Sequence, residues 1–165
     1  MNKIYLTLIT LTFLGCGPGE PQSITSSDSV SSITIPGNWD TNLPLNFIAS
    51  IEVGNMYDEQ YLVVITEPKR DFPTGTTLKE YSEKTRGFTV SASNGSATEP
   101  KSVNINGMPA IRVEIRGSVD GISVIYFHVS VEGANHFHQV IAWTMTEFED
   151  ENRDILDSVI RSFKE

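Results

Sequence analysis

The sequence predicts an α+β domain in which an antiparallel sheet is flanked by helices. In its second half, strand-like segments are separated by three turn signals, at Asn106-Gly107, Asp120-Gly121 and residues 133–135. Helical patterns precede and follow this region, over residues 77–88 and 150–163. Consecutive strands joined by tight turns form an antiparallel meander, and runs of strands with helices packed on them are typical of the α+β class.

The first 15 residues have the pattern of a secretory signal peptide. A positive residue, Lys3, precedes an uncharged and mostly apolar segment over residues 4–14. This length suits the apolar core of a signal peptide, about 7–15 residues, and is shorter than the roughly 20 residues of a membrane-spanning helix. Phe13-Leu14-Gly15-Cys16 resembles a bacterial lipobox, with Phe13 where that motif usually has Leu. We therefore expect Cys16, the only cysteine, to carry lipid; the alternatives are an ordinary signal peptide and a buried free thiol.

The remaining chain divides into a tether and one domain. Residues 16–31 are rich in Gly, Pro, Ser and Thr, a composition that favours a flexible tether behind the lipidated end. Residues 32–165 are expected to form a single domain. A mature chain of this size buries roughly 70% of its unfolded surface, so a core can stabilise it without disulfides.

Three strands are expected before the first helix. Residues 32–36 form a short strand that Pro36-Gly37 ends. Residues 45–53 carry apolar side chains at every second position, which predicts a strand with one buried face. Residues 60–66 contain a run, residues 61–65, that is apolar at successive positions, which predicts a strand covered on both faces.

The helices and the longest strands define the expected core. Thr77 and Glu80 fit a capping box at the start of the first helix, whose apolar stripe would include Phe88. The helix over residues 150–163 has one apolar face. Residues 122–132 are apolar on both faces, so we expect this strand to be central, with a helix on each side of the sheet.

Three short motifs are spread along the chain: Ile35-Pro36-Gly37-Asn38-Trp39, Ile105-Asn106-Gly107-Met108-Pro109-Ala110 and the closing Ile160-Arg161-Ser162-Phe163-Lys164. Together they resemble the PsbP-like family, which includes small bacterial DcrB-like lipoproteins. Their order and spacing match the family over nearly the whole mature chain. The resemblance implies a central antiparallel sheet with helices on its faces. It implies no reaction, because a shared fold does not define an activity.

Charge and motif content exclude several classes of function. With 12 Lys and Arg against 21 Asp and Glu, the net charge is −9, which argues against binding nucleic acid. The sequence contains no His-Glu-x-x-His, no Gly-x-Ser-x-Gly and no phosphate-binding glycine loop. We therefore expect a non-enzymatic protein without a cofactor. Its expected role is that of an accessory or binding domain, lipid-anchored in the bacterial cell envelope, facing the periplasm and engaging an envelope protein.

The three histidines give an alternative, a small-ligand or metal-binding periplasmic protein. If residues 133–135 form a three-residue loop, Glu132 pairs with His136, and His128, His136 and His138 share one face of the sheet. Such a cluster suits zinc or copper. A shift of one residue in register would move His128 to the other face. Histidines on a sheet face are common without metal, so the prediction is that no metal binds.

Overall fold

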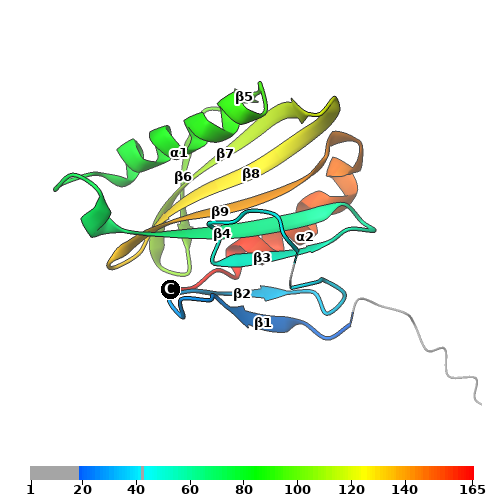
Figure 1. Ribbon diagram of the computed structural model, residues 1–165, viewed down its shortest axis with the longest axis horizontal. Coiled ribbons are helices and arrows are strands. Elements are labelled where there is room, and N and C mark those ends of the chain that lie inside the picture. Colours follow the sequence, from blue (N-terminus) through cyan, green and yellow to red (C-terminus); the bar gives the residue numbers. More distant parts are fainter. Residues whose placement is uncertain (1–18, 42) are drawn as a thin grey trace, which may run out of the picture.

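The computed structural model describes residues 19–41 and 43–165, which form one large sheet, a small sheet and two long helices (Figure 1). The large sheet has seven antiparallel strands in the order β3-β4-β9-β8-β7-β5, with β6 also paired to β7. The elements are β1 Gln22–Thr25, β2 Ser32–Ile35, β3 Ile51–Asn55, β4 Gln60–Pro68, η1 Lys69–Asp71, α1 Leu78–Ala92, β5 Ser96–Ala97, β6 Lys101–Ile105, β7 Met108–Val119, β8 Ile122–Glu132, β9 His136–Met145, η2 Thr146–Phe148 and α2 Glu149–Arg161. The α+β prediction is confirmed.

Two tight turns connect the long strands as the sequence predicts. At the β6–β7 turn, Asn106 and Gly107 have φ angles of 48° and 91°, and at the β7–β8 turn Asp120 and Gly121 have 52° and 82°. Two successive positive φ angles are required by the type I′ turn, whose twist matches that of the strands it joins. The Asn106 side chain also donates hydrogen bonds to the carbonyls of Arg161 and Phe163, which ties this turn to the end of α2.

The third turn differs from the prediction by one residue of register. Glu132 pairs with Phe137, and not with His136. The amide of Gly133 donates to the carbonyl of His136, at 2.9 Å, so His136 closes the turn and pairs with Pro68 of β4. Because side chains alternate across a sheet, this shift changes the face of every residue on β9 relative to β8.

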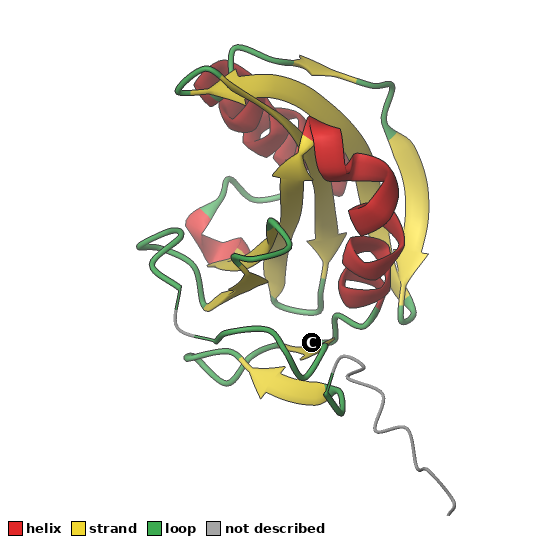
Figure 2. Cartoon of the chain, turned by 90° about the vertical axis from the view of Figure 1, so that its right-hand side faces the viewer, coloured by secondary structure: helices red, strands yellow, loops and turns green. Residues whose placement is uncertain are grey.

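The two helices lie on opposite faces of the sheet (Figure 2). Thr77 and Glu80 form the predicted capping box at the start of α1. The α2 face of the sheet contains the main core, to which α2 and the residues after it contribute Leu156, Val159, Ile160 and Phe163. β8 is an interior strand, as predicted for residues 122–132, and its Phe127 is fully buried in this core.

Two predictions before the first helix are wrong. Residues 22–31 belong to a β1–β2 hairpin and not to a tether, because Ser26, Asp28 and Ser31 close its turn with hydrogen bonds. Polar turn residues have the same composition as a flexible linker. The strand predicted over residues 45–53 begins only at Ile51, since the Asn46 side chain accepts from the amide of Ile48 and bends the chain.

The expected signal peptide, residues 1–15, and Cys16 lie outside the described residues. Within the two described ranges, neither helix combines the length and apolar character needed to cross a bilayer.

Candidate functional site: an apolar groove and a histidine cluster

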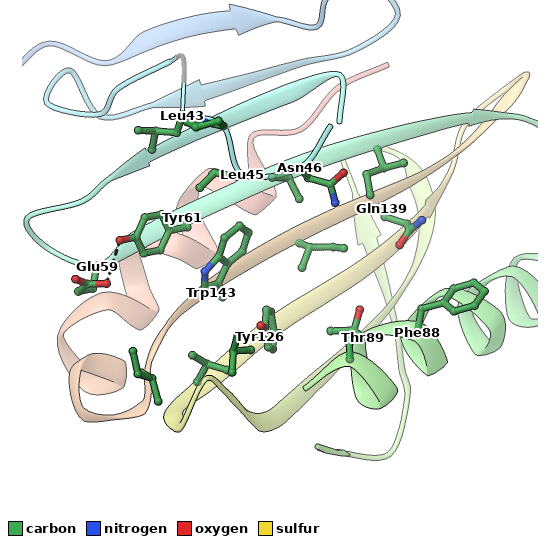
Figure 3. Close-up of a pocket in the computed structure, with 18 of the residues that line it drawn as sticks. Leu43, Leu45, Asn46, Glu59, Tyr61, Phe88, Thr89, Tyr126, Gln139 and Trp143 are labelled. Atoms are coloured by element: carbon green, nitrogen blue, oxygen red, sulfur yellow. Dashed lines mark hydrogen bonds between the residues drawn. The ribbon is translucent and has the colours of Figure 1, made fainter. Parts of the chain in front are cut away.

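The sheet face opposite α2 carries a row of aromatic side chains from three neighbouring strands. Tyr61 of β4 and Tyr126 of β8 both pair in register with Trp143 of β9. The Tyr61 and Trp143 rings are stacked with their centres 5.4 Å apart, and Tyr126 lies 6.0 Å from Trp143. Cross-strand aromatic pairs stabilise a sheet, but here the three rings also form a floor that is only partly buried (Figure 3).

This floor belongs to an apolar groove of about 960 Å³, bounded by α1, by residues 43–46 and by Ile48. The start of α1 is held on the sheet by Tyr81, which stacks on Phe137 at 4.6 Å and donates a hydrogen bond to Glu67. From there α1 packs mainly against β7 and β8, and its second half lines one side of the groove through Phe88, Thr89 and Ala92. Ligand-binding pockets commonly have volumes of this order, about 300–1,000 Å³.

Exposed apolar side chains are concentrated around the groove. Among the described residues, eight large hydrophobic side chains are strongly exposed, and five of these line the groove: Ile48, Met56, Phe88, Val119 and Ile122. Phe88, predicted as a core residue of α1, is 65% exposed. Contiguous exposed apolar surface on a monomer is typical of an interaction site.

The charged side chains of the groove are acidic. Glu59 and Asp120 line it, and within the described part of the chain its lining contains no Lys or Arg. The Tyr61 hydroxyl donates to Glu59 at 3.0 Å. Burial, together with Glu59, raises the pKa of Tyr61 to about 12, so the phenol stays neutral and keeps its proton. The groove therefore offers apolar contacts, a few polar groups and a negative rim.

The structure separates the three predicted metal candidates. His128 faces α1, where both ring nitrogens lack a hydrogen-bond partner among the described residues. Burial lowers the pKa of His128 to about 4. His136 and His138 lie on the opposite face, so the register prediction that grouped all three histidines is wrong.

His136 and His138 instead meet Glu165, a residue that the sequence analysis did not identify. His136 Nδ1 lies 2.9 Å from Glu165 Oε1, and His138 Nε2 lies 3.5 Å from the same oxygen. Burial raises the pKa of Glu165, but hydrogen bonds from His136 and from the Ala134 amide outweigh it and leave the pKa below its ordinary value. No local sequence pattern indicates this contact, because Glu165 is a single carboxylate that lies at least 27 residues from the two histidines.

The structure resembles solved proteins over most of its length. Cyanobacterial PsbP (CyanoP) from Synechocystis matches with a TM-score of 0.62 and 12% identity, over 95% of this chain and 98% of that chain. The chain has a PsbP-like fold.

LpqN, involved in cell envelope biogenesis of Mycobacterium tuberculosis, matches with a TM-score of 0.63 and 12% identity over 88% of this chain and 90% of that chain. A Pseudomonas aeruginosa protein of unknown function matches with a TM-score of 0.53 and 12% identity. The match covers 87% of this chain and 96% of that chain. No family model and no curated protein matches the sequence. Identities this low establish the PsbP-like fold alone. Activity and partners must be inferred from the groove and the histidine cluster of this chain.

Proposed function

We propose that the chain is a membrane-anchored lipoprotein of the bacterial cell envelope and that its PsbP-like domain is a non-enzymatic binding module. In this proposal the apolar groove docks a peptide segment of an envelope protein. The segment has apolar side chains on one face and Lys or Arg residues beside them. The observation that carries the proposal is the concentration of exposed apolar side chains around one open groove.

The shape and lining of the groove favour a protein segment over a small polar ligand. Tyr61, Trp143 and Tyr126 provide a continuous aromatic floor, and Phe88 and Ile122 add apolar contacts at the rim. Aromatic anchors in a desolvated centre carry most of the binding free energy at protein interfaces. An apolar groove is also the receptor surface for amphipathic helices.

The charge of the groove favours basic flanking residues on the partner. Glu59 and Asp120 provide negative charge, and the whole chain carries a net charge of −9. Complementary charges accelerate association and disfavour acidic partners. The same charge disfavours fatty-acid carboxylates and anionic lipid head groups as ligands.

The proposed anchor fits this role. Lipid on Cys16 would hold the domain close to the membrane, where a tethered binding module meets envelope partners at high effective concentration. The structural similarity to LpqN, a protein involved in envelope biogenesis, supports the same location for this chain.

The proposal is tested with two synthetic amphipathic peptides that share an apolar face and differ only in Lys or Glu flanks. Binding is followed by the fluorescence of Trp143 in the groove, since the second tryptophan, Trp39, is buried. We expect the Lys-flanked peptide to bind more tightly, and the difference between the peptides to shrink as salt screens the exposed charges.

Phe88→Ala should weaken binding of the Lys-flanked peptide by roughly 10-fold or more, because it removes an anchor at the rim without adding charge. Phe47→Ala is the matched control, because Phe47 is fully exposed and does not line the groove. Equal affinity for both peptides at low salt, or equal losses in the two variants, would contradict the proposed groove function.

A further inference from the structure

We propose that His136, His138 and Glu165 form a binding site for Zn²⁺ or a similar divalent transition metal. The three side chains offer two imidazole nitrogens and one carboxylate oxygen, and these donor atoms all lie within 4.8 Å of one another. The site is on the α2 side of the sheet, whereas the apolar groove is on the other side, so this inference is independent of the proposed groove function.

The distances between the donor atoms suit a tetrahedral metal. Ligand atoms that sit about 2.0–2.2 Å from a tetrahedral zinc ion are about 3.4 Å apart. Glu165 Oε1 lies 2.9 Å from His136 Nδ1 and 3.5 Å from His138 Nε2. These two values lie on either side of the tetrahedral separation. The ligand nitrogens of the two histidines lie within 4.8 Å of each other, so the imidazole rings would have to approach by at most about 1.4 Å to bind one ion.

His138 is oriented as a metal ligand. Its Nδ1 lies 3.1 Å from the Thr66 hydroxyl, which also contacts Ser50. Its Nε2 is buried, has no hydrogen-bond partner among the described residues, and is directed to the Glu165 carboxylate. Metal-ligating histidines commonly use one ring nitrogen for a partner of this kind and the other for the ion. A bound cation would satisfy the buried Nε2.

Glu165 is held in place by the β8–β9 turn. Its Oε2 accepts a hydrogen bond from the amide of Ala134 at 2.6 Å, which leaves Oε1 for the two histidines. Gly133 leaves room for this arrangement, because a Cβ atom there would collide with the Glu165 carboxylate. The carboxylate is thus positioned by the backbone before any ion binds.

The donor set indicates the class of metal. Imidazole nitrogen suits zinc, copper and nickel, whereas calcium and magnesium prefer oxygen ligands. Three protein ligands leave a fourth position for water or for a group from a partner, as in open zinc sites. The His136 side chain is 23% exposed and the Glu165 side chain 17%, so solvent reaches this position.

A metal here would join two parts of the fold. Lys164 pairs with Ser32 of β2 through two backbone hydrogen bonds of 2.8 and 2.9 Å. The ion would link the neighbouring Glu165 to His136 and His138 of β9. Metal binding would therefore tie the β1–β2 hairpin, through residues 164–165, to the large sheet.

The test is calorimetric titration of the full chain, without a polyhistidine tag and in detergent, with ZnCl₂. We expect one Zn²⁺ per chain. Glu165→Gln and His136→Ala should each weaken binding by at least about 10-fold, the lower limit seen even for residues that only support metal ligands. Glu132→Gln is the matched control, because it removes a nearby carboxylate that pairs with Lys69 and not with the histidines.

Gly133→Ala gives a second test that keeps all three ligands. The added methyl group should displace the Glu165 carboxylate and weaken zinc binding, while circular dichroism stays unchanged. Co²⁺ provides a spectroscopic readout, because tetrahedral coordination gives intense visible absorption that should be lost in Glu165→Gln. Absence of saturable zinc binding by the wild-type chain, or equal affinity in the wild type, Glu165→Gln and Gly133→Ala, would overturn the proposal.

Discussion

The guanidinium carbon of Arg153 on α2 lies 4.9 Å from the centre of the Phe127 ring on β8. Arg153 also donates two hydrogen bonds to Glu114 of β7, the residue opposite Phe127 in the sheet register. One side chain therefore joins α2 to two strands, by a cation–π contact and an ion pair. This contact covers the aromatic ring at the centre of the sheet.

Phe127→Ala should lower the free energy of unfolding by about 3–5 kcal/mol, because truncation of a fully buried aromatic leaves a cavity and removes apolar contacts. Urea denaturation measures this change. Phe88→Ala makes the same substitution on an exposed ring and should change stability by no more than about 0.5 kcal/mol. Similar losses in the two variants would refute the assignment of β8 as the core strand.

Stability should fall as the pH drops from about 6.5 to about 4 because of His128. The unfolded chain binds a proton on His128 near pH 6.5, whereas the folded chain does so only near pH 4. Between these values the unfolded state holds more protons, so the free energy of unfolding rises with pH. The accumulated difference is roughly 3 kcal/mol.

His128→Leu removes the titrating ring and tests this dependence. Thermal or urea unfolding between pH 4 and 7 should give a flatter profile for the variant than for the wild type. If the free energy of unfolding changed with pH by the same slope in both proteins, His128 would titrate alike in the folded and unfolded chains.

Thr77→Ala should destabilise the protein by about 0.5–2 kcal/mol, because it removes the hydroxyl that accepts from the Glu80 amide at the start of α1. Thermal unfolding followed by circular dichroism measures this change. The nearby Thr74 is exposed, so Thr74→Ala serves as the control and should leave the melting temperature nearly unchanged. Equal effects at both positions would argue against the cap.

Cys16→Ser tests the expected lipid anchor. We expect the variant to remain unprocessed or to leave the membrane fraction. A lipoprotein carries several acyl chains, which together anchor it stably, whereas a single acyl chain binds a membrane only marginally. Fractionation after a high-salt wash, with a labelled fatty acid to detect modification, measures the outcome. Equal membrane recovery of a processed variant, or absence of the fatty-acid label from the wild type, would contradict lipidation at Cys16.

Local patterns in the sequence were sufficient for much of the architecture. The two Gly-containing turns at Asn106 and Asp120, the capping box at Thr77 and the two-sided apolar pattern of residues 122–132 are each encoded within a few neighbouring residues. They therefore predicted the hairpins, the start of α1 and the interior position of β8. Backbone sterics and burial at a fixed period act locally, so they leave a local signal.

The groove and the histidine cluster depended on tertiary structure. The chain alone did not reveal that His136 closes its turn, and this single residue of register moved His128 to the other face. The chain also did not reveal that Trp143 stays only partly buried in the groove or that Glu165 reaches His138. These features arise from contacts between residues distant in the sequence, and their free energies depend on how whole elements pack. Local sequence patterns determined the two helices and the long strands of the second half of the chain, and packing decided which of their side chains came into contact.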